Sequence, residues 1–150
     1  MTFTGGTFPV YNSVAKVGTK GSASVDTDMK TIAELESCEI KVAGKTEDWT
    51  SMTSAGWGST MMTGKTMSVT CKAKRCIGDI GNDYVSSTAY KDGLDCNSKF
   101  SITFPDGGIL SFDCVLDVTN PGSGESSAAA ALEFEAKCSG KPTYTAGTGA

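Results

Sequence analysis

The sequence predicts a mainly β fold: an antiparallel β-sandwich or rolled barrel with one short flanking α-helix, a long inter-strand loop and an extended N-terminal arm. Five segments alternate apolar and polar residues, which is the period of strands with one buried face. Turn-forming residues separate these segments, and the chain of 150 residues contains 18 glycines. No repeat or boundary divides the chain, so residues 1–150 are expected to form a single domain.

Residues 1–30 are expected to form the irregular N-terminal arm. They are rich in Thr, Gly, Ser and Lys and contain isolated apolar residues such as Phe3, Phe8 and Val10. This composition leaves two alternatives open, a disordered arm or an arm that lies against a neighbouring subunit.

The five predicted strands each place apolar residues on one face and polar residues on the other. The turn Pro105–Gly108 joins the third and fourth strands into a β-hairpin. The apolar faces hold Cys38, Ile40 and Val42 in residues 35–42; Met67, Val69, Cys71 and Ala73 in 67–73; Phe100, Ile102 and Phe104 in 100–104; Leu110, Phe112, Cys114, Leu116 and Val118 in 110–118; and Leu132, Phe134, Ala136 and Cys138 in 132–138.

The connection over residues 43–66 is unusually long for a structureless loop in a compact domain. A Gly- and Ser-rich loop cannot bury large side chains by itself, so it either folds back over the core or docks on another chain. Its aromatic and methionine residues are Trp49, Met52, Trp57, Met61 and Met62.

One helix is predicted over residues 82–92. Asn82 is expected to cap its start, Asp83 to lie at its positive end and Gly93 to close it. Tyr84 and Val85 begin a short inward-facing stripe, and a helix of this length needs a sheet to pack on.

The six cysteines are expected to stay reduced. The N-terminus lacks the basic and apolar regions of a signal peptide, and no segment reaches the roughly 20 apolar residues that span a bilayer. We therefore expect folding in a cytoplasm, where thiols are kept reduced. Cys38, Cys71, Cys114 and Cys138 lie on apolar strand faces as small buried side chains, whereas Cys76 and Cys96 are expected to be more exposed.

No catalytic, cofactor or metal site is predicted. The chain contains no histidine, which removes the usual general base and most zinc sites. Residues Gly58 to Thr66 resemble a phosphate-binding loop, but one residue too many separates the two glycines, and Gly64 is expected in a turn. Asp79, Asn82 and Asp83 lack the ligand spacing of a calcium loop and are better explained by helix entry.

Four carboxylates lie on the polar faces of the last two long strands, and paired carboxylates are the catalytic groups of glycosidases. Here Lys and Ser are interspersed among them, so a solvated, acid-leaning sheet face is the favoured interpretation. The net charge of −4 also argues against a tight nucleic-acid clamp. The four residues are Asp113, Asp117, Glu133 and Glu135.

The order of elements and several short stretches between residues 31 and 145 resemble a phage major tail tube protein. The stretches are Gly56-Trp57-Gly58, Thr63-Gly64-Lys65-Thr66-Met67-Ser68-Val69, Gly78-Asp79-Ile80-Gly81-Asn82-Asp83-Tyr84-Val85, Phe100-Ser101-Ile102-Thr103-Phe104-Pro105-Asp106-Gly107 and Ser139-Gly140-Lys141-Pro142-Thr143-Tyr144-Thr145. The resemblance implies a non-enzymatic subunit whose hexameric rings stack into a hollow tube, with DNA passing through without specific binding.

The resemblance also implies roles for particular segments. Residues 43–66 would reach a neighbouring ring, with the five Trp and Met residues as subunit contacts, while the N-terminal arm and residues 144–150 would make further contacts. Some of the four carboxylates would face the lumen. The implied partners are further copies of the chain and other tail proteins such as the tape measure and tail tip. Assembly would occur in the host cytoplasm, and the final location would be the virion tail.

Two alternatives remain open at this point. One is the inner tube of a contractile tail or of a secretion or bacteriocin machine, which would use the same ring logic. The other is a β-sandwich carbohydrate-binding module that stacks sugars on Trp49 and Trp57.

Overall fold

The computed structural model describes residues 5–147. It contains an eight-stranded antiparallel sheet in the order β2-β1-β5-β6-β7-β4-β3, with β8 paired to β6. The described chain has one α-helix, α1 (Ile80–Thr88), which confirms the mainly β fold with a single short helix. The strands are β1 Val14–Gly18, β2 Met29–Thr31, β3 Leu35–Thr50, β4 Gly58–Lys74, β5 Asn97–Thr103, β6 Ile109–Ser123, β7 Ala131–Cys138 and β8 Thr143–Thr145.

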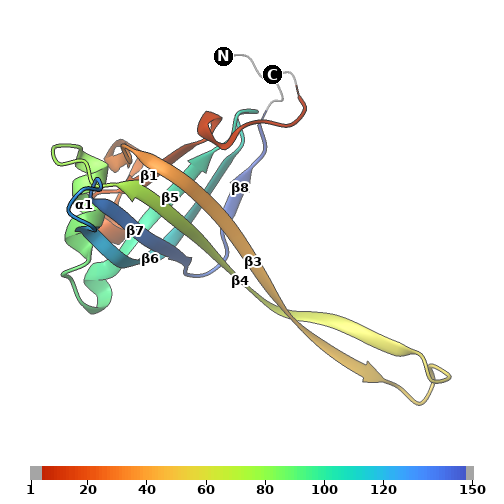
Figure 1. The fold of residues 1–150 in the computed structure, drawn as a ribbon. Coiled ribbons are helices and arrows are strands. Elements are labelled where there is room, and N and C mark those ends of the chain that lie inside the picture. Colours follow the sequence, from red (N-terminus) through yellow and green to blue (C-terminus); the bar gives the residue numbers. More distant parts are fainter. Residues whose placement is uncertain (1–4, 148–150) are drawn as a thin grey trace.

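The sheet is rolled around its apolar face. Its two outer strands, β2 and β3, are joined only by residues 32–34, so the ends of the strand order lie close together. Figure 1 shows the strands curving around a common interior, with α1 at one end and a β3–β4 ribbon projecting from the body. Helix α1 packs against β6, β2 and β1.

The core lies on the apolar faces that the alternation predicts. Phe100, Phe112 and Phe134 come from three adjacent strands, and the Phe100 ring centroid lies 5.8 Å from that of Phe112 and 6.3 Å from that of Phe134. Val85 of α1 is fully buried against this sheet. Burial of such side chains contributes roughly 1.5–3 kcal/mol each, so this cluster is the main source of stability.

The prediction of an irregular arm over residues 1–30 is wrong in part. Strand β1 lies inside the sheet between β2 and β5, and its Ala15 and Val17 are buried. Its alternation spans only five residues, and its partner β5 is distant in sequence, so the local pattern alone did not reveal it. Phe3 and the rest of residues 1–4 lie outside the described residues, as do residues 148–150.

Helix α1 begins and ends earlier than the predicted 82–92. Asp79, not Asn82, is the N-cap, because its Oδ2 accepts a hydrogen bond from the Asn82 backbone N–H at 3.0 Å. Asn82 instead lies fully buried in the first turn. Gly93 does not close the helix; it begins the 3-10 turn Gly93–Cys96. Among residues 5–147, no helix has the length and apolarity needed to cross a membrane.

The expected long loop over residues 43–66 is instead an extended β-hairpin. β3 and β4 pair continuously from Leu35 opposite Ala73 to Thr50 opposite Gly58. Gly64 is therefore a strand residue beside a β-bulge, not a turn residue, and the glycine-rich stretch around it is no phosphate-binding loop. A register shift at Lys45/Thr46 leaves Thr63 as the extra residue, whose hydroxyl donates to the Lys45 carbonyl at 3.1 Å.

Candidate assembly surfaces

The first candidate surface is the projecting hairpin, residues 43–66. From here on we call this hairpin the arm, and residues 1–30 the N-terminal segment. β7 covers the free edge of β4 only from Ser68 to Lys74, so within the described chain the arm strands pair only with each other. A two-stranded ribbon is marginally stable alone in water. The arm therefore depends on the β4–β7 pairing at its base and on any surface that it meets.

A tight turn closes the arm. Ala55 and Gly56 have φ values of 53° and 88°, and the Trp57 N–H donates to the Ser54 carbonyl at 3.1 Å. Two central residues with positive φ are the pattern of a type I′ hairpin turn, which matches the twist of paired strands. The Ser54 hydroxyl also lies 2.8 Å from the carbonyl oxygens of Ser51 and Trp57.

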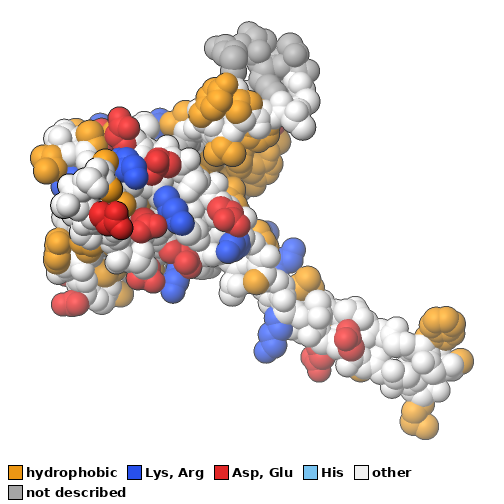
Figure 2. Space-filling view, in the orientation of Figure 1, with side chains coloured by type: hydrophobic (Ala, Val, Ile, Leu, Met, Phe, Trp, Pro, Cys, Tyr) orange, Lys and Arg blue, Asp and Glu red, His pale blue; other side chains and the backbone are white. Residues whose placement is uncertain are grey.

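The outer part of the arm, residues 49–62, carries no charged side chain, and we call it the tip. Figure 2 shows hydrophobic side chains gathered at this far end. The structure brings together all five predicted contact residues there, with exposed fractions of 103% for Met52, 80% for Trp57, 57% for Met61, 49% for Met62 and 43% for Trp49. An exposed cluster of this composition is typical of a protein–protein contact.

The strand register decides which tip residues act together. Trp49 lies opposite Ser59, and Met61 opposite Glu47, which places Trp49 and Met61 on one face of the ribbon. Met62 lies on the other face, over Gly44. A Cβ atom added to Gly44 would come within 2.8 Å of the Met62 sulfur and methyl group, so the absence of a side chain at Gly44 makes room for Met62. The tip thus presents apolar side chains on both faces.

The second candidate surface is an apolar groove of about 570 Å³ between the N-terminal segment and the first half of β3. Exposed Val10 and Tyr11 form part of its wall. Glu34 and Glu36 are the acidic residues of its lining, and Glu34 has φ 60°, an unusual conformation for a residue other than glycine. Sequence reasoning missed the groove, because its walls come from segments brought together only by the rolled sheet.

The third candidate surface is the outward face of β5, β6 and β7, opposite the core. All four predicted carboxylates lie on it, and Asp117 is directly opposite Glu135. Lysines pair with two of them: Lys137 lies 3.5 Å from Asp117, and Lys72 of the neighbouring strand β4 lies 3.8 Å from Glu133. Asp113 is directly opposite Lys99.

Within these three strands the face stays acid-leaning, because β5 and β7 carry one lysine each, Lys99 and Lys137, against the four carboxylates, and β6 carries none. Figure 2 shows acidic and basic side chains interleaved on the body. No group of three or more metal-binding side chains occurs within residues 5–147.

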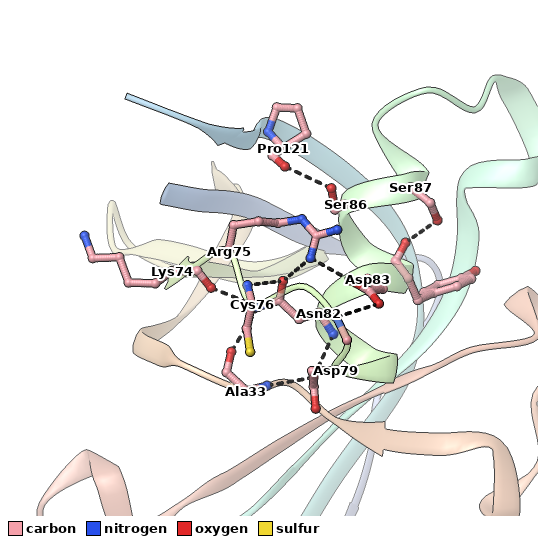
Figure 3. A network of polar contacts seen from close by, with 12 residues as sticks. Ala33, Lys74, Arg75, Cys76, Asp79, Asn82, Asp83, Ser86, Ser87 and Pro121 are labelled. Atoms are coloured by element: carbon pink, nitrogen blue, oxygen red, sulfur yellow. Dashed lines mark hydrogen bonds and ion pairs between the residues drawn. The ribbon is translucent and has the colours of Figure 1, made fainter. Parts of the chain in front are cut away.

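A buried polar network joins α1 to the ends of β3 and β4 that lie in the body, remote from the arm (Figure 3). Asn82 is its centre: Oδ1 accepts from Arg75 Nη1 at 2.9 Å and from the Cys76 N–H at 3.0 Å. Its Nδ2 donates to the carbonyls of Ala33 at 3.1 Å and Lys74 at 2.9 Å. The network joins the segment just before β3, the end of β4 and the helix, and so holds α1 against the body.

Arg75, the chain's only arginine, also pairs with Asp83 at 2.7 Å. The hydrogen bond from Arg75 lowers the pKa of Asp83 below its usual value, with a further contribution from the Gly78 backbone N–H. The sequence offered one signal for this network, an Arg followed by a cluster of Asp and Asn, which sequence reasoning assigned to helix entry alone.

No protein-family model and no curated protein matches the sequence. Among solved structures, the chain is similar to a chain in the tail of an empty gene transfer agent particle from helical refinement with C6 symmetry, with a TM-score of 0.72, 18% identity and coverage of 93% of this chain and 100% of that one. It is also similar to a chain in the virion of a native gene transfer agent particle, with a TM-score of 0.67, 21% identity and the same coverage of 93% and 100%. The chain shares the fold of these particle components, which confirms the fold that the tail tube resemblance implied.

Proposed function

We propose that this chain is a structural, non-enzymatic subunit of a phage-type tail tube, whose rings stack into a conduit for DNA delivery. The observation that carries the proposal is the arm: a paired ribbon that leaves the body and ends in an uncharged Trp- and Met-rich tip. In an isolated chain the apolar side chains of the tip remain exposed to water, which is unfavourable, so the tip is best explained as a contact surface. On a body with the fold of a tail component, it serves to join one copy to another.

Six copies in a ring is the arrangement that we favour. Support comes from the solved tail with C6 symmetry, whose chain is matched over its whole length. In this proposal the partners are further copies of the chain together with tape measure and tail-tip proteins. Assembly takes place in the host cytoplasm, and the finished subunit resides in the virion.

The tip of one copy docks, in this proposal, in the apolar groove of the next copy. A patch that complements a pocket elsewhere on the same molecule produces a head-to-tail contact, which generates rings or helical stacks. Charge favours this occupant: Lys65 shares a strand face with Met62 and takes part in none of the salt bridges among the described residues, while Glu34 stands at the groove. Glu47, which lies directly opposite Met61, and Asp48 make the arm neutral overall, so Lys65 and Glu34 are proposed as one specific pair and not as a general match of charge.

The outward face of β5, β6 and β7 is the proposed lumen lining. Its acids (Asp113, Asp117, Glu133 and Glu135) outnumber the lysines of the same strands, Lys99 and Lys137, so the face is mildly negative and carries no positive patch. A duplex passing such a wall releases few counterions and is held weakly. This is what a conduit requires, since strong binding would stop transport.

Negative-stain electron microscopy with light scattering tests the proposal on the purified chain at high concentration. Wild-type protein is expected to form hollow rods of uniform width, and the double variant Trp57→Ser with Met61→Ser is expected to remain monomeric. Tyr90→Ser is the matched control, since Tyr90 is a 79% exposed aromatic on the body. Rods formed equally well by the tip variant would refute the role of the tip. A wild-type chain that stays monomeric both alone and with tail-tip proteins would refute the tube.

The groove is tested separately by charge exchange. Glu34→Lys and Lys65→Glu should each reduce rod formation alone. The two variants mixed should recover it, because alternating copies then bring a basic residue against an acidic residue at every contact between tip and groove, and a chain carrying both changes should also recover it. Equal assembly of all four proteins would show that the tip docks elsewhere.

A further inference from the structure

Two pairs of cysteines occupy directly opposite positions on neighbouring antiparallel strands. Cys38 lies opposite Cys71 on β3 and β4, and Cys114 lies opposite Cys138 on β6 and β7. Opposite residues of antiparallel strands have Cα atoms about 4.5–5.5 Å apart, within the range that a disulfide spans. The two pairs differ in where their thiols point.

In the first pair the sulfurs face each other. Cys71 Sγ donates to Cys38 Sγ across 3.8 Å, so a small side-chain rotation brings the sulfurs into bonding distance. In the second pair the Cys138 thiol donates to the Gly140 carbonyl at 3.2 Å instead. The Cys114–Cys138 pair therefore supplies an internal comparison with the same cross-strand placement and a different orientation.

We propose that Cys38 and Cys71 form a peroxide-reactive dithiol that closes to an intramolecular disulfide at the base of the arm. Cys71 is fully buried, whereas Cys38 is half-buried and lines the apolar groove beside Ile40. A small oxidant reaches Cys38 through the groove and cannot reach Cys71 directly. Cys38 is thus the attacking residue and Cys71 the resolving residue.

The electrostatics agree with this assignment. The hydrogen bond from Cys71 lowers the pKa of Cys38, while the same bond and burial raise the pKa of Cys71. In the comparison pair, burial raises the pKa of Cys114 to about 12 and also raises the pKa of Cys138. Since the thiolate is the nucleophile, Cys38 is the most reactive of the four.

The oxidation balances with hydrogen peroxide as the oxidant. The Cys38 thiolate attacks one peroxide oxygen, the O–O bond breaks, and a sulfenic acid forms on Cys38 while the departing hydroxide takes a proton to become water. Cys71 sulfur then attacks Cys38 sulfur, the S–O bond breaks, and the departing hydroxide takes the Cys71 proton as a second water. Two thiols are oxidised to one disulfide, and one peroxide is reduced to two waters.

The disulfide would link β3 to β4 within the part of the sheet that β7 still covers, near Ser68, where the β4–β7 pairing ends. It encloses the whole arm in the loop between residues 38 and 71, so the arm could no longer separate from its base strand by strand. The dithiol itself depends only on the fold. Its value, a stiffer arm once particles leave the reducing cytoplasm, rests on the proposed function.

Peptide mapping of the full-length folded chain tests the dithiol. The folded protein is treated with stoichiometric hydrogen peroxide, its remaining thiols are alkylated in denaturant, and it is digested with trypsin without reduction. The expected product is a disulfide between residues 31–41 and residues 66–72, the tryptic peptides that contain Cys38 and Cys71. Cys38→Ser and Cys38→Ala should both abolish this product and leave Cys71 alkylated, while Cys138→Ser should leave it unchanged.

Other products would overturn the proposal. These are full alkylation of Cys38 and Cys71 after oxidation, a Cys114–Cys138 link in their place, or a Cys38 link between two chains. Hydrogen exchange then reads the consequence: arm amides should exchange at least several-fold more slowly in the oxidised wild type and unchanged in Cys38→Ser. If the linked peptide forms but the chain never makes rods, the dithiol stands and the proposed tube function fails.

Discussion

Removal of the Asn82 side chain should destabilise the whole domain. In Asn82→Ala, the buried amide disappears and three backbone groups lose their partner: the Cys76 N–H and the carbonyls of Ala33 and Lys74. A buried group left unsatisfied costs about 1–3 kcal/mol, and the lower end applies here because Ala33 and Cys76 are only half-buried. With about 1 kcal/mol for the vacated space, the expected loss is about 3–4 kcal/mol.

Urea denaturation followed by far-UV circular dichroism measures this loss. Ser87→Ala is the control, because Ser87 is exposed and its hydroxyl donates only to the Tyr84 carbonyl of its own helix. That variant should stay within about 0.5 kcal/mol of the wild type. A loss below about 1 kcal/mol for Asn82→Ala, or a loss equal to that of the control, would refute the view that Asn82 ties α1 to the ends of β3 and β4.

Three further expectations concern the tip, the acid limb of stability and the lumen. Ala55→Asn should stabilise the tip by about 0.5–1 kcal/mol, because Asn tolerates the positive φ better, and faster hydrogen exchange of arm amides in this variant would contradict the turn assignment. Asp83 has a lowered pKa in the folded state, so its contribution to stability is present above the unfolded pKa of about 3.9 and is lost as pH falls through the folded pKa. Asp83→Asn should therefore flatten the pH dependence of urea midpoints on the acid side, and an unchanged profile would show that Arg75 does not hold this carboxylate. Asp117→Lys combined with Glu135→Lys should leave rods intact but slow DNA delivery in reconstituted particles, and undiminished delivery would remove this face from the lumen.

The strands with one buried face could be predicted from the sequence. Phe100 and Leu116 lie on predicted apolar faces, and both are buried. Helix α1 was predicted, but its start was placed too late, because Asp79 and Asn82 are both good N-cap residues. Only the structure shows that the Asn82 side chain donates to the Lys74 carbonyl, which leaves Asp79 as the N-cap. β1 escaped prediction because long-range pairing, and not local pattern, makes it a strand.

The arm shows why periodicity fails where a sheet leaves its core. Alternation is clear up to Val42, but beyond it neither face of the ribbon is buried, so selection for an apolar face disappears and the period-two pattern with it. The tip residues were grouped from the sequence, which left open whether they cover the core or dock on another chain; the structure shows them exposed. Their division between two faces could not be predicted, because it depends on the register Trp49 opposite Ser59, which the turn of the hairpin sets.

The bulge at Thr63 bears on how a free subunit avoids uncontrolled aggregation. Each arm strand has one unpaired edge, whose backbone N–H and C=O groups could template another strand, as in amyloid growth. An extra residue twists the ribbon locally and interrupts the regular ladder that such growth requires. A chain with Thr63 deleted would offer a straighter edge and would be expected to form ill-defined fibrils in place of defined assemblies.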